Sequence, residues 1–180
     1  MIRFAPFLPE HLTRLEVQAA QAELAAIAAQ PVNGQTLRWG GVAETCIEVL
    51  PRFAPLPASH AVSSQRADQS SPLGPDYAGA RIIACAGLLH QWPGRALAWA
   101  VVGRTEPRQW IAIARRMAAM IGSAERCGMR RIEAAADAEF PQGCRLLEML
   151  GFEIECRARA YSPAGRDHFL YAKIAESGIA

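Results

Sequence analysis

The chain has 180 residues, of which 51% are hydrophobic and 20% are charged, and its formal net charge is +2. This length fits a single domain over residues 1–180, and the near balance of charge argues against a nucleic-acid partner. No apolar run is long enough for a membrane span, and the N-terminus lacks a signal-peptide core. Five cysteines without a C-x-x-C pair predict reduced thiols, with no disulfide frame and no metal site. We therefore expect a soluble, cytoplasmic protein.

The N-terminal part begins with a short strand and a helical region. Apolar residues alternate over residues 2–7, as in a strand. Pro9 suits the first turn of a helix, and an alanine-rich run follows with high helix propensity. Pro31 ends this pattern, so we expect a helix within residues 9–29.

Two further segments precede the regular half of the chain. Residues 42–50 predict another helix, because their apolar side chains lie on one side of a helical projection. Residues 51–79 hold five of the twelve prolines together with serine, glutamine and aspartate. This composition predicts a long exposed loop, a lid or a disordered insertion.

The C-terminal half has a clear order of strand, strand, helix, strand, helix, strand and strand. A helix that connects neighbouring strands implies a parallel pair. We therefore expect an α/β (α+β) fold with a mixed, mostly antiparallel sheet, a central parallel pair and flanking helices. The expected elements are strands 80–89 and 96–102, a helix over 109–126, a strand over 131–137, a helix after Phe140 that Gly151 ends, and strands 153–160 and 167–174.

Several blocks in this half, taken in order, resemble the GNAT acyltransferases. More narrowly, they are similar to small GNAT-like proteins of tailed bacteriophages, some of which are described as internal virion proteins. The resemblance implies a GNAT fold and acetyl-CoA as co-substrate. The blocks are residues 83–88, 92–95, 98–100, 130–134, 150–153 and 161–173.

The resemblance also implies where CoA would bind. In the family, the loop after the fourth strand and the start of the next helix hold the pyrophosphate, because free N–H groups and the positive helix end favour an anion. The matching residues are Gly103, Arg104, Arg108 and Gln109. The turn has no internal glycine, and Glu106 adds a negative charge to it.

The pantetheine arm pairs in this family with the edge of the fourth strand. That strand corresponds to Trp99, Val101 and Val102, whose backbone groups would make the contacts.

The usual catalytic groups of the family are absent. Alignment on Gly151 puts Leu147 where many members have a tyrosine acid, and Phe140 where an asparagine is common. Amide formation from a thioester needs a base for the amine and an acid for the leaving thiolate. The substitute candidates are Glu133, Tyr161 and His90, each of which also has an ordinary structural interpretation.

These observations leave two kinds of function open. One is an acyl-CoA-dependent N-acetyltransferase that acts on a small amine or a protein amine. The other is a catalytically inactive GNAT-fold protein of a phage virion, of phage assembly or of a host interaction. The partners would then be an amine acceptor or phage structural proteins, in the host cytoplasm or the virion if the chain is phage-encoded. A homodimer is a further expectation from the family.

Overall fold

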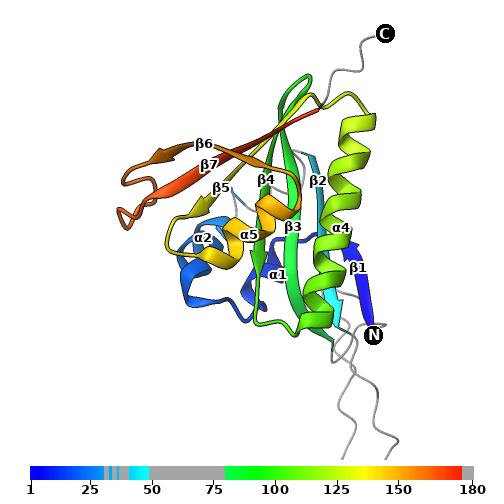
Figure 1. Ribbon diagram of the computed structural model, residues 1–180. Coiled ribbons are helices and arrows are strands. Elements are labelled where there is room, and N and C mark those ends of the chain that lie inside the picture. The colour runs from blue at the N-terminus through cyan, green and yellow to red at the C-terminus, as the bar shows by residue number, and fades with distance from the viewer. Residues whose placement is uncertain (31–32, 34–35, 37–40, 49–79, 176–180) are drawn as a thin grey trace, which may run out of the picture.

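A computed structural model describes residues 1–30, 33, 36, 41–48 and 80–175. A seven-stranded sheet with the order β1-β2-β3-β4-β5-β7-β6 forms the centre of the molecule (Figure 1). The strands are β1 (Ile2–Pro6), β2 (Gly41–Glu48), β3 (Arg81–Trp92), β4 (Arg95–Val102), β5 (Arg131–Asp137), β6 (Glu153–Ala158) and β7 (His168–Ile174). Every pairing is antiparallel except that of β4 with β5, which confirms the predicted mixed sheet and its central parallel pair.

Helices cover both faces of the sheet (Figure 1). The long helix α4 and the shorter α5 pack on one face with a buried apolar core, and the N-terminal helices pack on the other. The helices are α1 (Glu10–Thr13), the 3-10 turn η1 (Ala19–Gln21), α2 (Ala22–Ala28), α4 (Pro107–Arg126) and α5 (Pro141–Met149). No helix among these is long and apolar enough to cross a lipid bilayer.

The connection from α5 to β6 follows the predicted glycine stop. Gly151 has φ +82°, a left-handed conformation that glycine adopts without a steric penalty. Phe152 follows at 3% exposure and enters the core beneath α5. The local sequence therefore sets both the end of α5 and the start of β6.

The predicted helix at residues 42–50 is wrong for its described part, residues 42–48, which belong to strand β2. β2 lies between β1 and β3 and pairs with both of them. β-branched Val42, Thr45 and Ile47 suit this position, and pairing on both sides outweighs a weak helical pattern. The predicted loop over residues 51–79 lies outside the described residues.

The predicted helix within residues 9–29 is broken into α1, η1 and α2. Between them the chain is extended at Gln18, with φ −70° and ψ 145°. Val17 forms a bridge with Gly103, and the Glu16 carbonyl accepts the Arg104 N–H at 3.2 Å. These tertiary bonds replace the helical bonds that propensity alone favours.

Candidate functional site

The parallel strands β4 and β5 pair only at their N-terminal ends. The ladder joins Arg95 with Arg131, Ala96 with Ile132 and Leu97 with Glu133, and then stops. β4 continues to Val102 and β5 continues to Asp137 without pairing with each other. The two strand ends therefore leave a gap in the sheet, which we call the wedge.

A cavity of about 110 Å³ lies beside the wedge, between the sheet and the two helices of one face. Its walls come from β3, β4, β5, α4 and α5, and almost all of its lining side chains are apolar. Gln21 and Trp110 line it together with Asp137, which ends β5. The cavity is therefore mostly apolar, and the polar side chains of its lining lie at the open end of the wedge.

The side chain of Gln21 forms hydrogen bonds with the edge of β4 that β5 leaves unpaired. Gln21 Nε2 donates to the Ala100 carbonyl at 3.3 Å, and Gln21 Oε1 accepts the Val102 N–H at 3.0 Å. One side-chain amide thus makes both bonds that a neighbouring peptide group would make. Gln18 Nε2 adds donor bonds to the Val102 and Gly103 carbonyls at 3.3 and 3.1 Å.

The turn between β4 and α4 is closed by groups of the chain itself. The Gly103 N–H donates to the Ile83 carbonyl at 2.9 Å, and a Cβ on Gly103 would lie 2.7 Å from the Glu16 carbonyl oxygen. The backbone of residue 16 therefore packs where a side chain, or a ligand that approaches this glycine, would lie. Gly103 has a close-packing role in this turn.

The first turn of α4 carries an acidic residue at its N-cap position. Gln109 is fully buried, and its Oε1 accepts the Glu106 N–H at 2.7 Å. The Glu106 carboxylate pairs with Arg108 Nε at 2.9 Å, and Arg108 also lies 3.7 Å from a Glu48 oxygen. Arg104 is exposed beside a groove lined by Gln18, Thr105 and Trp110 among others. A carboxylate therefore lies at the helix end that would otherwise favour an anion.

The fold is shared with acetyltransferases of known structure. Ard1 from Thermoplasma volcanium superposes with a TM-score of 0.62 at 10% identity, over 97% of each chain. An acetyltransferase of the GNAT family from Bacillus anthracis gives 0.60 at 10% identity, over 97% of this chain and 95% of the other. The chain has the GNAT fold.

A third neighbour was solved with a ligand. An acetyltransferase from Bacillus subtilis in complex with CoA gives a TM-score of 0.56 at 12% identity, over 96% of this chain and 97% of the other. No protein-family model and no curated protein matches the sequence. At such identities the similarity establishes the fold, and the site has to be judged on the residues of this chain.

The residues of this GNAT fold match acyl-CoA in one part of the site. The apolar cavity and the amide-binding edge of β4 fit an acyl group and a pantetheine arm. The α4 turn, in contrast, holds its own carboxylate where the family places the pyrophosphate. Of the predicted cofactor residues, Val102 presents its N–H to the wedge, whereas Gln109 is buried in the turn.

Two other predicted residues of β4 have side chains that pack against the N-terminal core, although Trp99 is also among the residues that line the cavity. Trp99 packs edge-on against Phe7 with ring centroids 5.1 Å apart. Val101 is buried in the core that includes Phe7. Trp99 and Val101 would therefore contact a ligand in the wedge only through their backbone groups.

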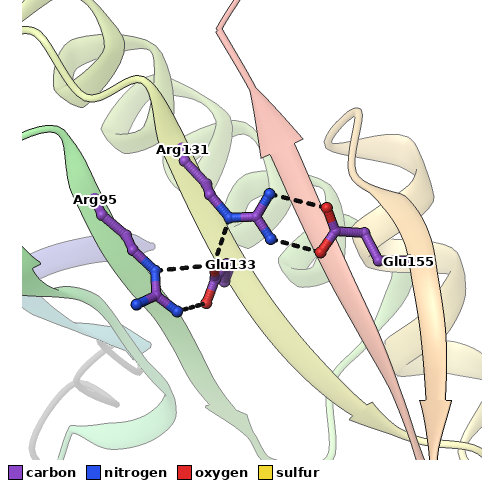
Figure 2. Close-up of polar contacts among 4 residues, drawn as sticks. All are labelled: Arg95, Arg131, Glu133 and Glu155. Carbon is purple, nitrogen blue, oxygen red and sulfur yellow. Dashed lines mark hydrogen bonds and ion pairs between the residues drawn. The ribbon is translucent and has the colours of Figure 1, made fainter.

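Glu133 belongs to a row of charges on the sheet, away from the cavity lining (Figure 2). Arg95 Nε donates to one carboxylate oxygen at 2.9 Å and Arg131 Nε donates to it at 2.5 Å. Arg131 also donates to Glu155 Oε1 at 2.9 Å, across β7 (Figure 2). The Arg95 hydrogen bond, followed by those from Arg131, lowers the pKa of Glu133, which makes it a weaker base.

His90 and Tyr161 lie at opposite ends of the sheet. His90 is exposed and pairs with Ala96, next to the hairpin that closes β3 and β4. Tyr161 is 51% exposed in the turn before β7, and its ring centroid lies 4.9 Å from that of His168. His168 pairs with Asp137, so Tyr161 lies near the end of β5 at which the wedge opens.

A buried polar cluster at that end was not predicted as a unit. Asp137 is 4% exposed and forms an ion pair of 2.5 Å with Arg166, which also lies 3.3 Å from Glu23 of α2. His168 is 1% exposed, and its Nε2 has no hydrogen-bond partner among the described residues. In the sequence, this cluster is visible only as the Arg-Asp-His segment at the start of β7. The segment cannot be linked to Asp137 until β7 is known to pair with β5.

Proposed function

We propose that the chain is an acyl-CoA-dependent N-acyltransferase of the GNAT type, with a small amine or a protein amine as acceptor. The observation that carries this proposal is the edge of β4 at the wedge. The Ala100 carbonyl and the Val102 N–H face an amide group there, and an apolar cavity lies beside them. That combination suits a pantetheine arm with an acyl group at its end.

Bound acyl-CoA would supply an activated thioester, and the chain would supply the surroundings. Apolar walls exclude water from the cavity, and the two backbone groups of β4 orient the arm. For these groups to bind an arm, the Gln21 amide has to withdraw from them.

The polar cluster at the end of β5 is the proposed acceptor side. Asp137 is the residue that belongs both to this cluster and to the cavity lining. Tyr161 lies near this end and is our proposed acid, while His168 offers a buried ring nitrogen. Glu133 and His90 lie elsewhere and have no part in this proposal.

A second candidate is a GNAT-fold protein without catalysis that binds other proteins, phage structural proteins among them if the chain is phage-encoded. The chain's own Gln21 and Glu106 fill the two places that a donor would take. Phe140 and Leu147 are apolar where the family commonly has polar catalytic groups. These features favour a protein that has the GNAT fold but whose own side chains fill the place where acyl-CoA would bind.

Thermal unfolding with increasing CoA separates the two candidates. A ligand that binds only the folded state raises Tm progressively with its concentration. The enzyme proposal predicts such a rise with CoA and a smaller one with ATP, which lacks the pantetheine arm. No rise at about 1 mM CoA, the upper end of usual enzyme affinities, would overturn it and favour the second candidate.

A further inference from the structure

The sheet beneath α4 and α5 is lined with unusually small side chains. Strands buried against helices usually carry large β-branched or aromatic residues there. Here Ala98 and Ala100 stay half-buried although helices cover this face, because a hollow lies above them. The alanines that line the cavity floor are Ala86, Ala98, Ala100, Ala134 and Ala136.

The helices above this floor contribute larger apolar groups. Met117 and Met120 come from α4, and Leu146 and Leu147 come from α5. Small residues below and large residues above would normally interdigitate, but here a cavity lies between them where the sheet splits. The missing methyl groups of the floor therefore leave a cavity instead of a closed core.

The cavity reaches the place where the wedge closes. Its lining along α4 runs from Trp110 to Ile121, twelve residues whose ends lie about 16 Å apart along the helix. Its far end is formed by Ile121, Leu88 and Phe152. Leu88 pairs with Ala98, next to the last rung of the β4–β5 ladder.

The size of the cavity exceeds the needs of a two-carbon acyl group. An engineered cavity of about 150 Å³ holds one benzene molecule, so a cavity of about 110 Å³ has room for about four carbon-sized groups. Its lining exposes a single charged side chain among the described residues, that of Asp137 at the open end. The far end therefore suits an apolar chain and disfavours a polar or ionic group.

We infer that the acyl group of the donor is longer than acetyl, with a linear apolar chain of about four to six carbons. The chain lies along the alanine floor and ends near Ile121 and Phe152. Leu147, which replaces the tyrosine common in the family, forms part of the apolar roof over it. This inference rests on the proposed function, because it names the substrate class of the same site.

Calorimetric titration with acetyl-, butyryl-, hexanoyl- and octanoyl-CoA tests it directly. Each methylene buried in the cavity is expected to tighten binding by about fourfold until the cavity is full, so hexanoyl-CoA should bind at least about tenfold more tightly than acetyl-CoA. Equal affinities along the series would overturn the inference and leave the proposed function intact. Absence of binding by CoA and by every acyl-CoA would instead overturn the proposed function.

The thioesters S-acetyl- and S-hexanoyl-N-acetylcysteamine carry the same acyl groups without the nucleotide. Their affinities report on the cavity alone, whatever the α4 turn does to phosphate. The same preference for hexanoyl is expected, and a preference for acetyl would overturn the inference.

Two variants locate the chain within the site. Ala98→Leu fills the floor and should remove the hexanoyl preference. Ala119→Leu, on the exposed side of α4, is the matched control and should keep the preference. Leu147→Phe narrows the cavity from the roof and should act like Ala98→Leu. A preference that survives both narrowing variants would contradict this placement of the acyl chain.

Discussion

Gln21 Oε1 accepts the Val102 N–H at 3.0 Å, although 81 residues separate the two in the sequence. Together with the bond from Gln21 Nε2 to the Ala100 carbonyl, this contact completes the hydrogen bonding of β4 at the place where β5 leaves it. An unpaired strand edge exposes donors and acceptors that need partners. The Gln21 amide supplies those partners and, in the proposed enzyme, competes with the donor for them.

Gln21→Ala is expected to lower stability and to tighten donor binding. Loss of two partly buried hydrogen bonds should reduce the free energy of unfolding by about 1–2 kcal/mol. Removal of the competing amide should increase CoA affinity at least severalfold, because the donor no longer has to displace it. Denaturant unfolding and calorimetric titration measure the two effects.

Gln18→Ala is the matched control for that variant. Gln18 also donates to backbone carbonyls of this strand end, at Val102 and Gly103, but it leaves the Val102 N–H bonded to Gln21. A similar loss of stability without a gain in CoA affinity is expected. If Gln21→Ala weakened CoA binding, the Gln21 amide would be a ligand contact and the competition proposed above would be wrong.

The helices and strands of the C-terminal half could be predicted, because the sequence features that specify them lie close to them in the chain. The apolar stripe of α4 and the glycine stop at Gly151 lie within one or two turns of the residues they control. The break at Gln18 could not be predicted, because it depends on bonds to residues 102–104 that form only in the folded chain. β2 was missed for the same reason, since two partner strands select its conformation.

The site was predicted less well than the fold. Family position pointed to Val102 as a cofactor-binding residue, which stays a prediction, and it did not indicate that Gln21 bonds to the Val102 N–H. Likewise, nothing local marks Arg166 and His168 as neighbours of Asp137; they meet because β7 pairs with β5. Long-range pairing decides these contacts.

Glu106→Gln is expected to improve donor binding at the α4 turn. The substitution removes a negative charge at the helix N-terminus while keeping a polar side chain, so repulsion of phosphate falls. CoA affinity should rise by about threefold to tenfold at low salt, and less at high salt because ions screen the charge. Titrations at two ionic strengths measure this.

Glu153→Gln on β6 makes the same change of net charge away from that turn. It should leave CoA affinity unchanged. Equal gains for Glu106→Gln and Glu153→Gln would show that net charge, rather than the α4 turn, governs binding.

Glu133→Gln is expected to affect stability rather than transfer. The Glu133 carboxylate is 21% exposed and bonded by Arg95 and Arg131, so its loss should cost about 1 kcal/mol at pH 7. The folded state lowers the pKa of Glu133 below its ordinary 4.5, so this stabilisation is present above pH 4.5 and is lost as the pH falls through the folded value. Denaturant unfolding of the unsubstituted chain and of Glu133→Gln from pH 3 to 7 measures this effect. The difference between their free energies of unfolding should shrink as the pH falls. A loss of transfer activity without a loss of stability would instead make Glu133 part of the chemistry.

Tyr161→Phe tests the proposed acid. Loss of the phenolic proton should lower kcat by at least about tenfold and leave KM nearly unchanged, because a general acid acts in the chemical step.

Tyr171→Phe is the matched tyrosine control. Tyr171 is buried next to the Cys144 thiol, and burial raises the pKa of its hydroxyl. Its removal should leave kcat unchanged and alter stability by less than about 1 kcal/mol. Equal losses of kcat in the two variants would contradict the role given to Tyr161.

Hydrogen–deuterium exchange with and without saturating hexanoyl-CoA tests most directly whether the wedge is the donor site. We predict slower exchange in peptides from β4 and the first turn of α4, and faster exchange at residues 16–21 as Gln21 is displaced. Unchanged exchange in β4 and at residues 16–21, with protection confined to other parts of the chain, would contradict the placement of the donor in the wedge.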